Sequence, residues 1–178
     1  MIAKRTEGIT SFIVMDVMEQ AHEMEREGAQ IIHLEVGEPD FDTPACIKEA
    51  AYQALEEGHT HYTHSLGLFE LREAISQYYF KTYQVSVEPD RVIVTSGSSP
   101  AILLLFAALL EKNDQVIISD PHYACYPNFI KFVEGVPVTV PVYEEDGFQY
   151  RPEVIREKIT PQTKAIFINS PSNPTGNL

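Results

Sequence analysis

The sequence predicts an α/β protein whose mostly parallel sheet is covered by helices on both faces. Its second half contains short stretches that are nearly all apolar, whereas a strand with one face in water would alternate apolar and polar residues. Connections of helix length separate these stretches, as expected for parallel strands. The chain of 178 residues is long enough for one domain with a sizeable core, and its hydrophobic content of 44% is ordinary for a globular protein.

The first elements are a helix and a short strand. Apolar residues recur at roughly helical spacing over residues 11–27, and Gly28 marks the end of this predicted helix. The stretch "IIHLEV", residues 31–36, then predicts a strand, and the turn-rich stretch "GEPDFDTP" follows it. The sequence therefore predicts an N-terminal helical arm before the main α/β region.

Two further helices are expected before the sheet begins. Thr43 is suited to cap a helix with Pro44 at its first position, and Gly58 is suited to end that helix. A second helix is predicted from about Leu68 to Tyr83.

From Arg91 onward the predicted strands and helices alternate. The strands are "RVIVT", "QVIIS", "VPVTVPV" and "KAIFINS"; the helices are "PAILLLFAALLE", "YPNFIKFVE" and a short one near Pro152 to Lys158. No linker or low-complexity tract interrupts this region.

Charge and cysteine content restrict the classes of partner and compartment. The formal net charge of −13 argues against a nucleic-acid-binding surface, which needs clustered Lys and Arg. Cys46 and Cys125 are too few for a disulfide scaffold, which favours a reducing compartment. The N-terminus lacks an apolar signal core, and the longest apolar run, residues 101–110, is too short to span a bilayer. We expect a cytoplasmic protein with neither a nucleic-acid nor a membrane partner.

The stretch "TSGSSPA", residues 95–101, is a candidate phosphate site. It lies between a predicted strand and a very apolar helix, where free backbone N–H groups and the hydroxyls of Ser98 and Ser99 suit a phosphate. No Lys follows as in a nucleotide P-loop, and no G-x-G-x-x-G pattern is present, so the phosphate of a nucleoside triphosphate is disfavoured. The alternative is that the two serines only cap the helix.

Three other stretches offer groups that could contact a ligand. Tyr123, in "DPHYACYP", follows a strand and could stack on a planar ligand, although loop tyrosines are more often packing residues. Gly37, in "GEPDFDTP", permits close approach of a ligand to the backbone, and the acids Asp40 and Asp42 are better explained as turn formers than as metal ligands. Asn173, in the closing "NSPSNPTG", offers both a donor and an acceptor at a strand end.

Taken together, these stretches resemble one enzyme family. "GEPDFDTP", "HYTHSLGLFELREAI", "VTSGSSPA", "DPHYACYP" and "NSPSNPTG" have the order and spacing of the amino-terminal part of a class I pyridoxal-phosphate aminotransferase, the aspartate-aminotransferase-like fold type I. The resemblance covers the chain from about Ile31 onward. It implies a large-domain sheet of the pyridoxal-phosphate-transferase kind, with residues 1–44 forming an arm and the start of the small domain. Residues 45–178 would then form the first, incomplete part of the cofactor-binding large domain.

The resemblance also implies a role for each candidate residue. Gly97, Ser98 and Ser99 would hold the phosphate of pyridoxal 5'-phosphate, and Tyr123 would stack on its pyridine ring, where many relatives have Trp. Asn173 would hydrogen-bond the ring oxygen. Tyr62 would reach the cofactor phosphate of the other subunit of a homodimer. Gly37 would offer its backbone to the substrate carboxylate. These roles agree with the chemistry expected of the residue types.

The histidines of the "HYTH" segment raise the question of a metal. His59, His61 and His64 are close in sequence but lack the i, i+4 pairing on a helix that zinc sites often use. We expect a solvated loop at the subunit interface there, and no metal site in the chain.

The implied reaction moves an amino group between an amino acid and a 2-oxo acid. Its Schiff-base lysine lies, in the family, beyond the "NPTG" turn, and none of the seven lysines of this chain occupies that motif. No catalytic residue is therefore expected among the 178 residues: we expect the sequence to stop inside its catalytic domain and to be inactive alone. Two alternatives stay open: a pyridoxal-phosphate-dependent carbon–sulfur β-lyase, and a non-catalytic fragment of the same fold.

Overall fold

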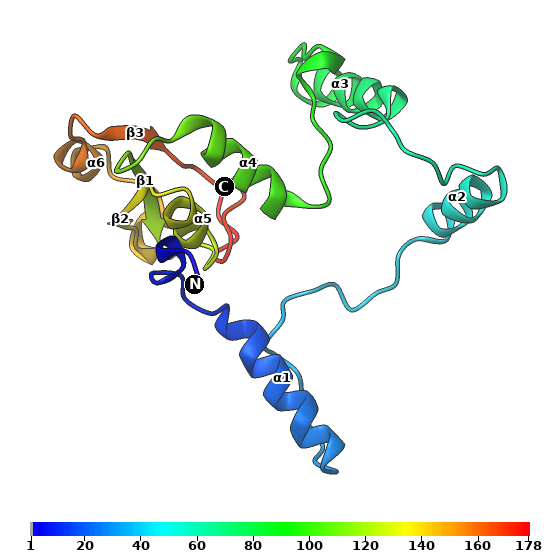
Figure 1. Cartoon of the computed structure of the whole chain (residues 1–178), viewed down its shortest axis with the longest axis horizontal. Coiled ribbons are helices and arrows are strands. Elements are labelled where there is room, and N and C mark those ends of the chain that lie inside the picture. Colours follow the sequence, from blue (N-terminus) through cyan, green and yellow to red (C-terminus); the bar gives the residue numbers. More distant parts are fainter. Residues whose placement is uncertain (1) are drawn as a thin grey trace. The chain divides into compact units, whose positions relative to one another are not determined.

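The computed structural model describes residues 2–178 and divides them into two units (Figure 1). The first unit combines residues 2–35 with Ser99–Leu178, and the second is Val36–Ser98. Each unit is described by itself. The predicted division into an arm of residues 1–44 and a large-domain part of residues 45–178 concerns the domains of a whole transferase and stays a prediction.

A three-stranded parallel sheet organises the first unit. Strands β1 (Gln115–Asp120), β2 (Val136–Pro141) and β3 (Thr163–Ile166) lie in the order β2-β1-β3, and both pairs are parallel. This confirms the predicted α/β class with a parallel sheet. Val116, Ile117 and Ile118 are all buried in β1, so both faces of the central strand are covered.

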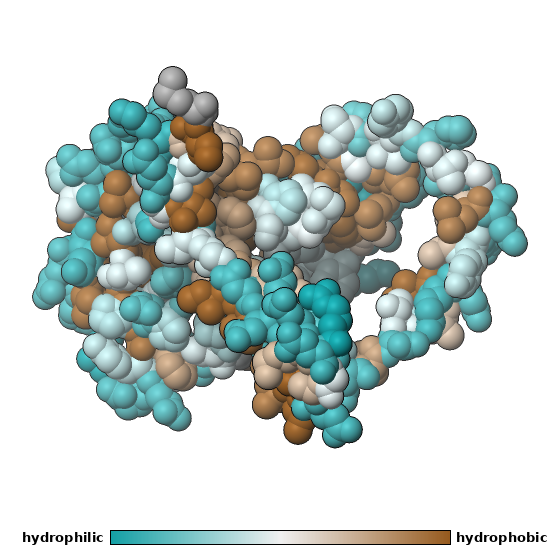
Figure 2. All heavy atoms as spheres, turned by 60° about the horizontal axis from the view of Figure 1, so that its bottom comes forward, coloured by the Kyte–Doolittle hydropathy of each residue, from teal (hydrophilic) through white to brown (hydrophobic). Residues whose placement is uncertain are grey.

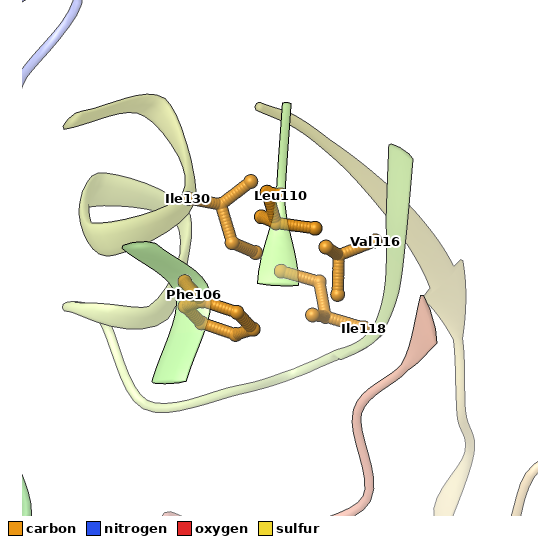
Figure 3. Close-up of a cluster of buried hydrophobic side chains, with 5 residues drawn as sticks. All are labelled: Phe106, Leu110, Val116, Ile118 and Ile130. Atoms are coloured by element: carbon orange, nitrogen blue, oxygen red, sulfur yellow. The ribbon is translucent and has the colours of Figure 1, made fainter. Parts of the chain in front are cut away.

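Two helices close one face of this sheet around the apolar core. Phe106 of α4 (Ser98–Leu109), Leu110 just after it and Ile130 of α5 (Tyr126–Phe132) form one cluster with Val116 and Ile118, as Figure 3 shows. The aromatic ring of Phe167 packs against this cluster. Since Val116 and Ile118 point to the same face of β1, the period of two in the strand sets which residues meet the helices.

The first unit contains further elements besides the sheet, α4 and α5. They are the 3₁₀ turns η1 (Lys4–Thr6) and η3 (Glu144–Asp146), and the helices α1 (Ile13–Arg26) and α6 (Pro152–Lys158). The segment before α1 is attached to α5: the side-chain amide of Asn128 donates to the carbonyl of Thr10 at 3.0 Å, and Lys131 Nζ donates to the carbonyl of Gly8 at 3.3 Å.

The second unit contains α2 (Ala45–Glu56), α3 (Phe69–Tyr83) and the turn η2 (Pro89–Arg91). Arg72 of α3 is buried and joins α3 to the turn at Gly67 and to η2, because its guanidinium donates to the carbonyls of Gly67 at 3.2 Å and Pro89 at 3.0 Å. Gly67 has φ +99°, and a Cβ atom there would lie 2.7 Å from the Val94 side chain. Glycine is therefore required at this turn.

Several predicted boundaries differ from the structure. The helices near 11–27, 68–83 and 152–158 are confirmed, but Thr43 is not the capping residue of α2: Pro44 occupies that position, and no side chain caps it. Residues 31–36 and 92–95 do not form strands. The physical reason is that a strand requires a ladder of hydrogen bonds with a neighbouring strand, and within residues 2–178 neither segment pairs with a strand of the sheet.

Large apolar side chains remain on the surface of both units. Ile32 and Leu34 are 86% and 87% exposed, and Leu104 of α4 is 60% exposed. The space-filling view in Figure 2 shows such apolar residues, in brown, among the polar ones. None of the helices in the described part of the chain combines the length and the apolar character that crossing a membrane requires.

Candidate functional site

The start of α4 forms a compact turn that leaves backbone donors free. Gly97 has φ +95°, its N–H donates to the carbonyl of Thr95 at 2.9 Å, and the Thr95 hydroxyl donates to the Gly97 carbonyl at 2.6 Å. Ser98 and Ser99 are the first residues of α4, which has 12 residues and no acidic residue in its first turn. The partial positive charge of this helix end and its free N–H groups favour an anion.

Tyr123 lies in the loop that follows β1, within a group of aromatic rings. Its ring centroid is 5.3 Å from that of Tyr126 and 5.7 Å from that of Phe12, and both pairs meet edge to face. A hydrogen bond with the Cys125 thiol is the main cause that raises the pKa of the Tyr123 phenol, burial adds to it, and a hydrogen bond with the Ser99 hydroxyl opposes it. Tyr123 therefore stays protonated beside the first turn of α4.

The backbone of Asn173 is held near Tyr126 by the hydrogen bonds that both residues make to Asn169. The N–H of Asn173 donates to the side-chain oxygen of Asn169 at 2.8 Å, and the hydroxyl of Tyr126 donates to the same oxygen at 3.2 Å. The Asn173 side chain itself is exposed. The side-chain oxygen of Asn169 thus connects Tyr126, after β1, with the turn after β3. The ring of Tyr126 in turn contacts the ring of Tyr123.

Parallel strands explain why these groups meet. Because β1 and β3 are parallel neighbours, their carboxyl ends reach the same edge of the sheet, where α/β proteins commonly bind ligands. The first unit therefore brings together Ser99, Tyr123 and Asn173, three of the residues that the sequence predicted. Gly97 and Ser98 directly precede Ser99 in the chain.

The sequence interpretation did not single out Tyr126 or Asn169, which hold this arrangement. Both stand in stretches that were noted for other residues: Tyr126 in "DPHYACYP", and Asn169 four residues before Asn173. A polar residue directly after an apolar strand was the available signal for Asn169. For Tyr126 the sequence offered none, since its burial and its bond to Asn169 depend on how α5 approaches the segment after β3, where the Tyr126 and Phe167 ring centroids are 4.7 Å apart.

Gly37 and Tyr62 belong to the second unit, which is described by itself. Gly37 has open space around it, and the side chain of Tyr62 is fully exposed. Of the neighbouring histidines, His64 accepts a hydrogen bond from the N–H of Leu66 at 3.2 Å, and His59 Nε2 lies 3.4 Å from a Glu57 carboxylate oxygen. The roles predicted for Gly37 and Tyr62 remain predictions.

Comparison with known proteins shows similarity to aminotransferases along the whole chain. The family described as "Aminotransferase class I and II" matches residues 29–178. The chain is 45% identical over 175 residues to an aspartate aminotransferase of Pyrococcus horikoshii and covers 44% of that protein. It is 42% identical over its full length to the (5-formylfuran-3-yl)methyl phosphate transaminase of Methanocaldococcus jannaschii, and covers 46% of it.

Solved structures agree with this similarity. An aspartate aminotransferase from Thermus thermophilus with maleate aligns with 98% of this chain at a TM-score of 0.93 and 40% identity. An alanine aminotransferase from Pyrococcus furiosus aligns with 100% of it at a TM-score of 0.92 and 39% identity. The chain covers 46% of each of these structures, so it spans about half the length of the proteins that it matches.

Proposed function

Because the chain belongs to the aminotransferase class I and II family, we propose that the protein carrying it transfers an amino group between an amino acid and a 2-oxo acid. The family match over residues 29–178 is the observation that carries this proposal. Since the chain spans about half of its relatives, the activity is proposed for the whole transferase and the 178 residues alone are proposed to be inactive.

The residues present fit the proposed cofactor, pyridoxal phosphate. This cofactor, when bound, supplies an electron sink for the bond broken at the α-carbon of the substrate. A phosphate fits the first turn of α4, where the N–H groups and hydroxyls of Ser98 and Ser99 are donors and no acidic residue competes. Gly97, with its positive φ, shapes the turn before them.

Tyr123 would hold the cofactor ring by stacking. Its edge-to-face contacts with Tyr126 and Phe12 restrict its rotation, so one face of the ring can be kept ready for a planar group. Its raised pKa keeps the phenol neutral, and a neutral ring does not repel an anionic ligand.

Asn173 would position the ring oxygen of the cofactor with its side-chain amide, since its backbone alone is engaged by Asn169. Within the described residues, the Thr175 hydroxyl is a buried polar atom without a hydrogen-bond partner, and it belongs to the same turn. A buried hydroxyl without a partner is costly, which is consistent with a turn that accepts a polar ligand.

Gly37 and Tyr62 are proposed to act on the substrate carboxylate and, across a homodimer, on the phosphate of the other subunit. The exposure of both residues leaves them available for such contacts. A cytoplasmic location is likewise proposed; both cysteines are free, as expected in a reducing compartment.

The test uses the whole transferase that contains this sequence, supplied with pyridoxal phosphate. Isotopically labelled amino groups of a panel of amino acids are followed into 2-oxo acids by mass spectrometry. Exchange supports the proposal. Release of pyruvate and ammonia from cysteine conjugates without exchange would assign a carbon–sulfur β-lyase instead, and the absence of both reactions would contradict an enzymatic function.

A further inference from the structure

A second group of ligand-bearing side chains lies on α1 and on the segment that follows it. His22 and Glu25 are one helical turn apart on α1, and His33 comes from the extended segment after it. One ligand atom from each of these three residues lies within 4.8 Å of the other two. His33 Nε2 is 3.0 Å from Glu25 Oε1, and the ring centroids of His22 and His33 are 5.5 Å apart.

The contact with Glu25 orients His33 toward α1. The His33 side chain is 37% exposed, and its Nε2 lies 3.0 Å from Glu25 Oε1 on α1. Ile31 and Glu35 are half-buried, whereas Ile32 and Leu34 are more than 85% exposed. His22 is exposed as well, so an ion from solvent can reach both imidazoles.

Glu35 orients the imidazole of His33. Its carboxylate oxygen lies 2.6 Å from Nδ1, and its side chain is only 10% exposed. With Nδ1 as the donor to Glu35, Nε2 is the atom directed at Glu25. A carboxylate that receives the second ring N–H of a histidine is the usual outer partner of a metal-binding histidine.

We propose that His22, Glu25 and His33 bind one divalent transition-metal ion, with Glu35 holding His33 in position. Two imidazoles and one carboxylate are a ligand set that zinc uses, whereas calcium and magnesium prefer oxygen ligands alone. The ion takes the place of the hydrogen between His33 Nε2 and Glu25 Oε1. Three ligands leave one position of a tetrahedral ion for water.

The distances suit such an ion after small side-chain rotations. Metal–ligand bonds of about 2.0–2.1 Å place neighbouring ligands of a tetrahedral zinc ion roughly 3.4 Å apart. The 3.0 Å separation of His33 Nε2 and Glu25 Oε1 is close to this value. The ligand atoms of all three residues lie within 4.8 Å of one another, so rotation of the exposed side chains toward the ion closes the remaining distance. This site differs from the His59, His61 and His64 segment weighed from the sequence, and it departs from the expectation that the chain holds no metal.

The experiment measures Zn²⁺ binding to the whole protein that carries this sequence, after chelator treatment and desalting. Isothermal titration is expected to give one site per chain. His22→Ala, Glu25→Gln and His33→Gln are each expected to weaken binding at least tenfold, and Glu35→Ala roughly tenfold. His59→Ala and His61→Ala, which replace exposed histidines elsewhere, are the matched controls and are expected to bind as the unchanged protein does.

A second measurement does not depend on any variant. With histidine-selective isotope labelling, Zn²⁺ should shift the ring signals of His22 and His33 and leave those of His59 and His61 in place. Unchanged affinity in the α1 variants, or shifts confined to other histidines, would overturn the proposal. Since neither readout uses transaminase activity, failure of this proposal and failure of the proposed function are distinguishable.

Discussion

At the scale of single residues, His33 has a carboxylate on each ring nitrogen. The hydrogen bond with Glu35 is the main cause that raises the His33 pKa from 6.5 to about 8, and the bond with Glu25 is the second. The same contact lowers the pKa of Glu35. Because the folded-state pKa of His33 is raised, the stabilisation that this contact gives is fully present below about pH 6.5 and is lost as pH rises through about 8.

We predict that an NMR titration of the metal-free protein gives His33 a midpoint near 8. Glu35→Gln should lower this midpoint, since the amide removes the negative charge that favours the imidazolium. The His61 signal of the same sample is the internal reference. A midpoint near 6.5 for His33 in the unchanged protein would show that the carboxylates do not hold its proton in solution.

Tyr123 is the residue through which the cofactor proposal can be tested most directly. Tyr123→Ala in the whole transferase removes the stacking ring, which is worth on the order of 1 kcal/mol beyond buried area, or about fivefold in the dissociation constant. We expect weaker retention of pyridoxal phosphate, measured by its absorbance after dialysis. The control is Tyr143→Ala, a half-exposed tyrosine that packs on Arg151. Equal retention of pyridoxal phosphate in both variants would mean that Tyr123 packs against its protein neighbours and does not hold the cofactor.

At the scale of elements, α3 depends on a buried guanidinium. Arg72 is 4% exposed and donates to two carbonyls and to Asp90 Oδ1 at 3.2 Å, while its guanidinium stands 5.5 Å from the centre of the Phe69 ring. These bonds tie the first turns of α3 to the turn η2. Asp90 is exposed, so its charge contributes little compared with the two carbonyls.

We predict that Arg72→Ala lowers the free energy of unfolding of the whole protein by about 1–3 kcal/mol, because it leaves partly buried carbonyls without a donor. Chemical denaturation followed by circular dichroism measures this. Arg156→Ala removes an exposed pair with Glu153 and should change the free energy by less than about 0.5 kcal/mol. If the two variants were equally stable, Arg72 would not anchor α3.

The pairing of strands also belongs to this scale. The sheet order β2-β1-β3 gives β1 two partners, while residues 92–95 have only an isolated bond from the Val94 N–H to the Leu66 carbonyl at 2.9 Å. The predicted strand that leads into the proposed phosphate turn therefore does not join this sheet. The second unit, Val36–Ser98, ends in that turn.

At the scale of the whole molecule, exposed apolar surface limits what the 178 residues can do alone. Ile32, Leu34, Leu104 and Leu105 are each more than half exposed. Surface of this kind favours association. We predict that the purified 178-residue chain does not unfold in a single two-state transition and that it associates in sedimentation velocity experiments. A monomer with one sharp calorimetric transition would contradict this.

The proposed homodimer adds a second test at this scale. If Tyr62 acts on the cofactor phosphate of the other subunit, a Tyr62→Phe transferase and a transferase lacking its Schiff-base lysine should regain activity when their subunits are mixed. Complementation follows because one of the two sites in the mixed dimer receives both intact groups. Subunit exchange verified by mass spectrometry without any recovery would assign Tyr62 to its own subunit or to no site.

Much of the local structure follows from the sequence alone. Helices α1, α3 and α6 lie where apolar spacing and terminal residues predicted them, because those signals act between residues that are neighbours along the chain. The apolar stretches of β1 and β2 likewise predicted buried parallel strands. The order of the five motif stretches was enough to indicate the family, which the comparisons then showed.

Only the tertiary structure decided which of these pieces meet. Residues 31–36 have a strand-like sequence and no strand partner among the described residues, because pairing depends on a neighbour in space. The bond between Tyr126 and Asn169 joins residues 43 positions apart. The approach of His33 to His22 and Glu25 depends on how the chain returns along α1. Contacts between distant positions leave no periodicity in a single sequence, so composition and spacing could not reveal them.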